Sequence, residues 1–136
     1  MICSGGLILS KKTKRFLLLK RTQEKTKGQW GLVGGKKEEQ DHNTIDTLTR
    51  EIKEELGFLP DIEKIIPLDY YNNNNFNYGT YIILTENEFL PLLNPEHSSY
   101  AWCKYKNWPS PLHKGLWYSL NNKINKIKLE CILSLI

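Results

Sequence analysis

The segment Thr44–Leu56, TIDTLTREIKEEL, constrains the fold most strongly, because its pattern is that of one amphipathic helix with defined ends. Its apolar side chains recur at helical spacing at Ile45, Leu48, Ile52 and Leu56. Asn43 or Thr44 can cap the amino end, and Gly57 suits the left-handed residue that often terminates a helix. Pro60 prevents continuation. We therefore predict a helix over this segment, packed through its apolar stripe.

The same helix carries three glutamates, Glu51, Glu54 and Glu55, within five positions. Helical residues three and four apart are neighbours, so Glu51 faces both of the others, and like charges there repel by a few tenths of a kcal/mol per pair. With Ile52 pointing inward, we expect the glutamates to flank the opposite face. That face is either simply solvated, as charge runs usually are, or it binds a hard cation such as Mg²⁺, which takes oxygen ligands.

The rest of the chain predicts a mixed α+β order, strands before and after this helix and a helix at the end. Apolar or alternating runs indicate strands at residues 5–9, 15–21, 30–35, 62–71, 77–86 and 100–105. The asparagine run Asn72–Asn75 is expected to form a turn. Pro109–Leu120 can open a helix, and a last helix is expected to pack through Ile124, Ile127, Cys131 and Leu135.

Composition narrows the class of protein. The 136 residues suit one domain, 1–136, and the net charge of +4 is spread over scattered lysines. That distribution favours a small anionic ligand over a nucleic-acid groove. Cys3, Cys103 and Cys131 show neither zinc spacing nor a disulfide framework, which favours a reducing cytoplasm. No apolar stretch approaches the length of a membrane span, so we expect no membrane partner.

The stretch GGKKEEQDHNTIDTLTREIKEELGF resembles the Nudix box, the signature of the Nudix hydrolases. Arg50–Phe58 matches the pattern R-E-U-x-E-E-x-G-U at every fixed position, where U is a bulky apolar residue. The order of a strand, WGLVGG, the box, later strands and a closing helix also fits that family. The resemblance implies an α/β/α sandwich with a mixed β-sheet and a single Nudix domain.

This chain departs from the family pattern in two places. Val33 stands where proline is usual before the glycine pair, a mild loss of turn rigidity. The family places five residues between the second glycine and a glutamate, then seven before the arginine; here Asp41 holds the glutamate position and eight residues precede Arg50. The extra residue precedes the helix and leaves the register of the three glutamates intact. The role of Asp41 stays open.

The resemblance also implies roles for individual residues. Divalent metal, Mg²⁺ with Mn²⁺ as an alternative, would be bound by the Gly35 carbonyl, Glu54 and Glu55, with Glu51 as a further ligand or base. Arg50 would orient Glu51. Family members often carry another acid before a late strand, and Glu96 is the best match, as metal ligand, general base or plain surface acid. For His97 beside it, an exposed loop residue is the preferred interpretation.

Substrate contacts are expected outside the box. Arg21, and Lys36 after the glycines, would meet phosphate. Phe76 and Tyr78, beside the asparagine run, are the aromatics least expected in the core and could stack on a base. The segment Pro111–Trp117 is expected either to line a wall of the site or to pack Leu112, Leu116 and Trp117.

The implied reaction is metal-dependent attack of water on phosphorus in a nucleoside diphosphate linked to another group. The leading substrate class is a nucleoside or deoxynucleoside triphosphate, cut to the monophosphate and pyrophosphate. Dinucleoside polyphosphates and nucleotide sugars are alternatives. A non-catalytic nucleotide-binding module is the alternative from another class. An RNA 5′-end hydrolase would need a clearer basic groove. A homodimer is left open.

Overall fold

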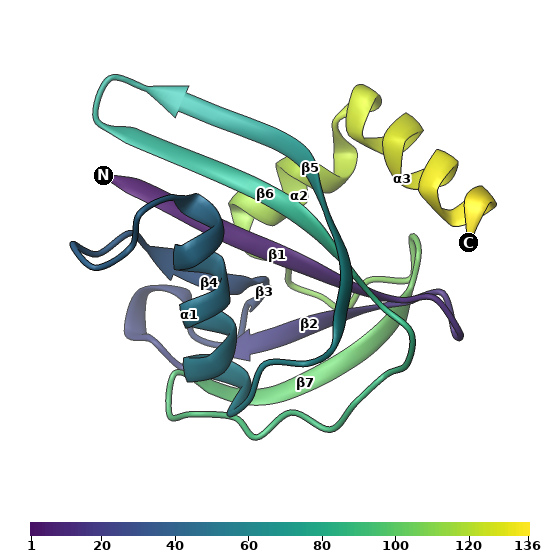
Figure 1. The fold of residues 1–136 in the computed structure, drawn as a ribbon, viewed down its shortest axis with the longest axis horizontal. Coiled ribbons are helices and arrows are strands. Elements are labelled where there is room, and N and C mark those ends of the chain that lie inside the picture. Colours follow the sequence, from purple (N-terminus) through teal and green to yellow (C-terminus); the bar gives the residue numbers. More distant parts are fainter.

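The sheet is organised around β1 (Ile2–Ser10) in the computed structural model, which describes residues 1–136 (Figure 1). One edge of β1 pairs antiparallel with β2 (Arg15–Arg21) and with β4 (Val33–Lys36). Its other edge pairs parallel with β6 (Phe76–Thr85) along the whole strand. The sheet is therefore mixed, as the sequence predicted.

The remaining strands extend the sheet on both sides of β1. β5 (Ile62–Asn73) pairs antiparallel with β6, while β3 (Trp30–Gly31) and β7 (His97–Lys104) both pair antiparallel with β2. The helical elements are the 3₁₀ turn Glu24–Thr26 and the helices α1 (Thr44–Leu56), α2 (Lys114–Asn121) and α3 (Lys123–Leu135). No helix is long and apolar enough to cross a membrane.

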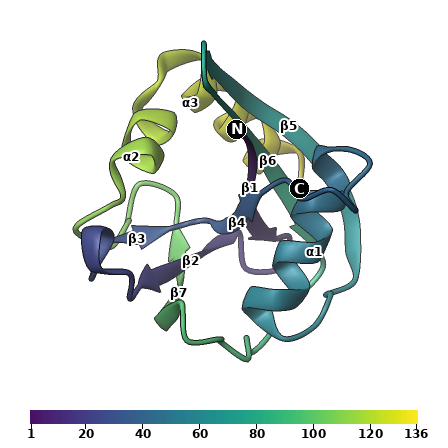
Figure 2. The same cartoon turned by 90° about the vertical axis from the view of Figure 1, so that its left-hand side faces the viewer.

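Two cores lie on opposite faces of the sheet, because neighbouring residues of a strand point to opposite faces. In β1, Leu7 and Leu9 belong to one core and Ile8 to the other. Leu116, Leu120 and Leu129, from α2 and α3, complete the first core; Leu48, Ile52 and Leu56, from α1, complete the second. Figure 2 shows α1 on one side of the strands and α2 with α3 on the other. The expected α/β/α sandwich is confirmed.

The predicted ends of α1 are confirmed. The side chain of Asn43 caps the helix by accepting a hydrogen bond from the backbone N–H of Asp46 at 2.9 Å. Gly57 ends it in the left-handed conformation, with φ of 83°, and donates its N–H to the Lys53 carbonyl. These two caps fix which side chains of α1 lie over the sheet.

The predicted packing face of the last helix is wrong. Ile124, Ile127, Cys131 and Leu135 are exposed in α3. The residues that pack are Asn125, Leu129, Ile132, Leu133 and Ile136. Both stripes have helical spacing, and the packed one places the amide of Asn125 against Asp69, a partner no local pattern could reveal.

Other element boundaries differ from the sequence predictions by a few residues. Asn72 and Asn73 continue β5, so the turn is confined to Asn74 and Asn75. α2 begins at Lys114, after the prolines, where His113 accepts the Gly115 N–H. One prediction for Pro111–Trp117 was that Trp117 packs into the core. It does not, because half of its surface is exposed.

Candidate active site

Glu55 is the most buried of the three glutamates on α1, with 1% of its surface exposed. Its Oε2 accepts the backbone N–H of Gly34 at 3.1 Å. Burial, with the charge of Glu51 nearby, raises the pKa of Glu55 well above that of an ordinary carboxyl. The expectation that the glutamates flank a face opposite the packed one is therefore wrong for Glu55. The helix presents this carboxyl to the glycine pair of β4 rather than to solvent.

Arg50 connects the groups around this carboxyl. Its Nη1 donates to Oε1 of Glu51 at 3.0 Å and lies 3.3 Å from Oε1 of Glu54. Its Nη2 donates to the backbone carbonyl of Lys36 at 2.8 Å. Arg50 therefore contacts Glu51 directly, as the expected role of Arg50 in orienting Glu51 requires.

Asp41 holds Arg50 from the other side. Its two carboxylate oxygens accept from Nε and Nη2 of Arg50 at 3.2 and 2.9 Å, and Thr47 donates to Oδ2 at 3.0 Å. The guanidinium holds the pKa of Asp41 far below its ordinary range. Asp41, in the loop that carries the extra residue, therefore holds Arg50 in place.

The glycine pair of β4 allows the backbone to approach this helix. A side chain at Gly35 would overlap the carboxylate of Glu51, and one at Gly34, where φ is 154°, would overlap the carbonyl of Ser4. At Gly34 a side chain would meet the backbone of β1, whereas at Gly35 it would push the Glu51 carboxylate aside. The backbone of Gly35 therefore lies directly against the Glu51 carboxylate. This position agrees with the expectation that the Gly35 carbonyl is a metal ligand.

Glu96 and His97 lie where β7 begins, facing the same helix. Glu96 is exposed, and its charge contributes to the raised pKa of Glu55. His97 is buried, contrary to the expected exposed loop position, because it is the first residue of β7. Its Nε2 lies 3.7 Å from Oε1 of Glu55, and its Nδ1 is buried without a hydrogen-bond partner. Burial and the charge of Arg21 lower the pKa of His97 to about 4, so the ring is neutral.

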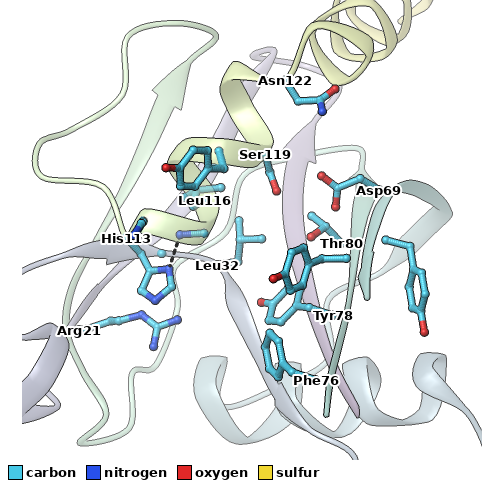
Figure 3. A pocket seen from close by; sticks show the side chains of 16 residues that line it. Arg21, Leu32, Asp69, Phe76, Tyr78, Thr80, His113, Leu116, Ser119 and Asn122 are labelled. Atoms are coloured by element: carbon cyan, nitrogen blue, oxygen red, sulfur yellow. Dashed lines mark hydrogen bonds between the residues drawn. The ribbon is translucent and has the colours of Figure 1, made fainter. Parts of the chain in front are cut away.

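A pocket of about 790 Å³ opens on the other side of Arg21, between β6 and α2 (Figure 3). Arg21 and His113 lie at one end, and Asp69, Thr80 and Ser119 gather at the other. The apolar lining between these ends comes from Leu32, Leu116, Phe76 and Tyr78. Its shape therefore offers a polar group at each end and apolar walls in the middle. We call it the α2 pocket.

The Arg21 end of the α2 pocket is cationic and donor-rich. The Nε of Arg21 is buried and has no hydrogen-bond partner. Nδ1 of His113 accepts the Gly115 N–H at 3.1 Å, which leaves Nε2 as the donor of the neutral ring. Burial and the charge of Arg21 lower the pKa of His113, which favours that neutral form. An anionic group entering here would meet the guanidinium of Arg21 and the ring N–H of His113.

The other expected substrate contacts divide between two places. Phe76 and Tyr78 line the α2 pocket, with ring centres 6.1 Å apart. Lys36 does not line it; its side chain is exposed at the end of β4. Burial raises the pKa of Tyr78 to about 12, so its hydroxyl keeps its proton. The structure thus brings Arg21, Phe76 and Tyr78 together and leaves Lys36 outside.

The carboxylates fit a hard divalent cation by their chemistry. No three His, Cys, Asp or Glu side chains surround one point as they are placed. However, the donors are all oxygens, and burial raises the pKa of both Glu51 and Glu55, so a cation beside them would favour their charged forms. Glu54 is half exposed on the same helix and pairs with Arg50 at 3.3 Å. These three carboxylates and the Gly35 carbonyl are the oxygen donors that could hold such an ion.

Several groups at the pocket went unrecognised in the sequence. Asp69 is a lone acid within the strand pattern LDYY, and Thr80 and Ser119 are isolated hydroxyls. Within the segment Pro111–Trp117, expected to form a wall, His113 was not singled out. A signal existed only for Asp69, since an acid inside an otherwise apolar strand needs a partner.

Comparison with known proteins gives a consistent result. The family model described as NUDIX domain matches residues 3–121. No curated protein matches the chain. Among solved structures, the chain is similar to the MutT NUDIX hydrolase from Burkholderia pseudomallei, with 26% identity over 90% of this chain and 96% of that one and a TM-score of 0.69.

Two further solved structures share the fold at lower identity. One is the NUDIX domain of Shewanella oneidensis NrtR complexed with ADP ribose, with 20% identity, 76% and 72% coverage of the two chains and a TM-score of 0.64. The other is the E. coli dihydroneopterin triphosphate pyrophosphohydrolase, with 17% identity, 99% and 96% coverage and a TM-score of 0.62.

Proposed function

The chain belongs to the NUDIX family, whose hydrolases cleave a nucleoside diphosphate linked to another moiety, and from that premise we propose a specific activity. It is a Mg²⁺-dependent pyrophosphohydrolase that converts a nucleoside or deoxynucleoside triphosphate to the monophosphate and pyrophosphate. The observation that supports this proposal is the position of Arg21. It lines the α2 pocket and lies opposite His97 in the pairing of β2 with β7, and Nε2 of His97 lies 3.7 Å from Oε1 of Glu55.

We assign separate roles to the residues around the carboxylates of α1, which we call the metal side. Glu51, Glu54 and Glu55, with the Gly35 carbonyl, would hold Mg²⁺, with Mn²⁺ as a substitute. Such an ion would supply charge neutralisation at the phosphate oxygens and a lower pKa for water. Arg50 keeps the carboxyl of Glu51 oriented through its 3.0 Å hydrogen bond. Glu51 and Glu96 are the two candidates to take the proton from the attacking water.

The pocket side holds the rest of the substrate. Arg21 and His113 donate hydrogen bonds to phosphate oxygens, and Phe76 and Tyr78 present their rings to the base.

Two structural relatives suggest alternative substrate classes. One relative is complexed with ADP ribose and another is a dihydroneopterin triphosphate pyrophosphohydrolase. Both ligands combine a heterocycle with a phosphoanhydride, which is the chemistry we assign to this site. A nucleotide sugar or ADP-ribose is therefore the second substrate class to assay.

The test is product analysis of the purified protein with triphosphates, ADP-ribose, nucleotide sugars and dinucleoside polyphosphates. Each is incubated with Mg²⁺, with Mn²⁺ and with chelator. We expect monophosphate and pyrophosphate from triphosphates, and no product with chelator or in Glu54→Gln. The exposed neighbour Lys53→Gln serves as the matched control. Release of product from another class alone would overturn the triphosphate assignment.

The alternative from another class, a nucleotide-binding module without turnover, makes a distinct prediction. Such a module would bind nucleotides tightly with every metal and release no product. The crowded carboxylates argue against such a module, because they repel one another. Arg21 already offers a contact for phosphate, so nucleotide binding alone would not require them. Binding without turnover in all metals would establish the module and reject the hydrolase.

A further inference from the structure

The end of the α2 pocket farthest from Arg21 is built around Asp69. This carboxylate comes from β5, at a register shift between Pro67 and Asp69 in the pairing with β6. Such a shift bends the strand and changes the direction of a side chain. Figure 3 shows the Asp69 carboxylate beside Thr80 and Ser119, facing the pocket.

Asn125 of α3 fixes this carboxylate in place. Its Nδ2 donates to Oδ2 of Asp69 at 2.6 Å and to the carbonyl of Ser119 at 2.9 Å. Asn125 is 2% exposed, so its amide cannot turn away to water. Because the amide holds one oxygen from behind, the remaining acceptor sites of the carboxylate are available to a ligand in the pocket.

The two ends of the α2 pocket therefore require different groups on one ligand. Arg21 and His113 offer donors, which call for an anion. Asp69 offers two acceptor oxygens side by side, which call for two neighbouring N–H donors in one plane. Between them, Leu32, Leu116 and the rings of Phe76 and Tyr78 accept the faces of a flat ring.

The four common base types present different edges to such a carboxylate. Guanine has N1–H next to its exocyclic amino group, so two donors lie together. Adenine and cytosine have an amino donor next to a ring nitrogen that accepts, and uracil or thymine has one N–H between two carbonyls. A lone pair facing a carboxylate oxygen is repelled and leaves a polar group without a partner.

Resting on the proposed function, we propose that Asp69, held by Asn125, is a specificity-determining residue that selects the paired N–H donors of guanine in the hydrolysed nucleotide. The amino group at position 2 of the base is the feature recognised. Inosine nucleotides, which differ from guanosine nucleotides only in lacking it, are therefore discriminated against. A good bidentate contact of this kind changes base preference by about tenfold or more.

The test measures binding separately from turnover. Isothermal titration with the α,β-methylene analogues of GTP and ITP, in Mg²⁺, gives the preference of the folded protein for the amino group. We expect the GTP analogue to bind about tenfold more tightly than the ITP analogue. In Asp69→Asn the amide oxygen can still accept from Asn125, while an NH₂ group faces the ligand. There the preference falls to within about twofold, because the paired acceptors are lost.

Controls keep structural and functional explanations apart. Asp61→Asn changes an exposed acid outside the α2 pocket and should keep the full preference. The melting temperature of Asp69→Asn should stay near that of the parent. If Asp69 serves only to anchor α3, the variant loses stability and keeps the preference, which overturns the inference.

The remaining outcomes are equally decisive. Equal binding of both analogues by the parent protein, or binding of neither, overturns the role of Asp69. Preferred binding of the GTP analogue without hydrolysis of GTP supports base recognition and rejects the proposed hydrolase. Hydrolysis of GTP and ITP with equal kcat/KM supports the hydrolase and rejects this inference.

Discussion

On α1 a single guanidinium is hydrogen-bonded to three carboxylates, whereas in the α2 pocket the guanidinium of Arg21 keeps a buried Nε without any partner. The first region is short of positive charge and the second is short of negative charge. Under the proposed function, a divalent cation would add positive charge to the first region and a substrate phosphate would add negative charge to the second. The two parts of one metal–nucleotide ligand would then occupy the two regions.

The two regions also differ in how firmly their parts are held. Arg50 is fixed on both sides, by Asp41 and by the carbonyl of Lys36. At the pocket, Tyr70, Tyr71 and Tyr118 are more than half exposed. Arg50 is therefore held by more contacts than these exposed side chains at the pocket. Substitutions should therefore reduce kcat in the first region and raise KM in the second.

The largest effect is expected from removing one carboxylate of α1. Glu54→Gln keeps the shape of an exposed side chain and should lower kcat/KM by about a thousandfold, because metal binding fails. Steady-state kinetics across a Mg²⁺ titration measures it, with an unchanged circular dichroism spectrum as control. Full turnover at saturating Mg²⁺ would show that Glu54 is not a ligand.

Arg50→Lys should have the next largest effect, a loss of about a hundredfold in kcat with little change in KM. Lysine keeps the charge but cannot donate to Asp41, Glu51 and the Lys36 carbonyl at once. The kinetics should be measured together with the melting temperature at the assay pH. An unchanged kcat would mean that Glu51 needs no orienting group.

Arg21→Gln tests the pocket side. We expect KM for the triphosphate to rise by about tenfold while kcat falls much less, because a phosphate contact is lost and the carboxylates are untouched. Thermal unfolding with and without nucleotide gives an independent measure. A fall in kcat with unchanged KM would contradict the division of the two regions.

Asp41→Asn should cost only about fivefold in kcat, since the amide still accepts one hydrogen bond from Arg50. Its clearer effect is on stability against pH. The pKa of Asp41 is lowered in the folded protein, so its stabilisation is present above the unfolded pKa, about 4, and is lost as pH falls through the folded value. The parent should therefore melt higher than the variant at pH 7.

That difference in melting temperature should shrink steadily below about pH 4, where Asp41 begins to lose its advantage over asparagine. Differential scanning calorimetry at several pH values between 2 and 7 measures it. A gap that is constant over this whole range would show that the ion pair with Arg50 does not stabilise the fold.

Lys36→Ala should have the smallest effect, at most about threefold in KM, because an exposed ammonium contributes little to a phosphate contact. The backbone carbonyl that binds Arg50 is retained in this variant. A tenfold effect in the same assay would place Lys36 with Arg21 as a principal phosphate contact.

The metal side could be predicted from sequence because it is local. The helix, its caps and the order of its glutamates follow from spacing within Asn43–Gly57 and were confirmed. The burial of Glu55 could not be predicted, since it depends on the approach of Gly34, which pairing with β1 brings about. Spacing gives the register of a helix but not which element covers it.

The pocket side could be predicted only in part. Arg21, Phe76 and Tyr78 were expected at the substrate, and the structure brings them together. Asp69 and Asn125 were missed, because their contact joins β5 to α3 across 56 positions of sequence. The same contact explains why the wrong face was predicted for α3. The prediction followed isoleucines at helical spacing, whereas the face that packs carries the polar side chain of Asn125.

The position of β1 has a consequence for biosynthesis. Its full length pairs with β6, from Ile2 opposite Asn77 to Ser10 opposite Thr85. Because β1 precedes β6 in the chain, it waits for the synthesis of 75 more residues, the difference between Ser10 and Thr85, before this edge is covered. At typical synthesis rates the wait is on the order of 4–15 s. During that time the unpaired N–H and C=O groups along this edge of β1 are open to pairing with another extended segment.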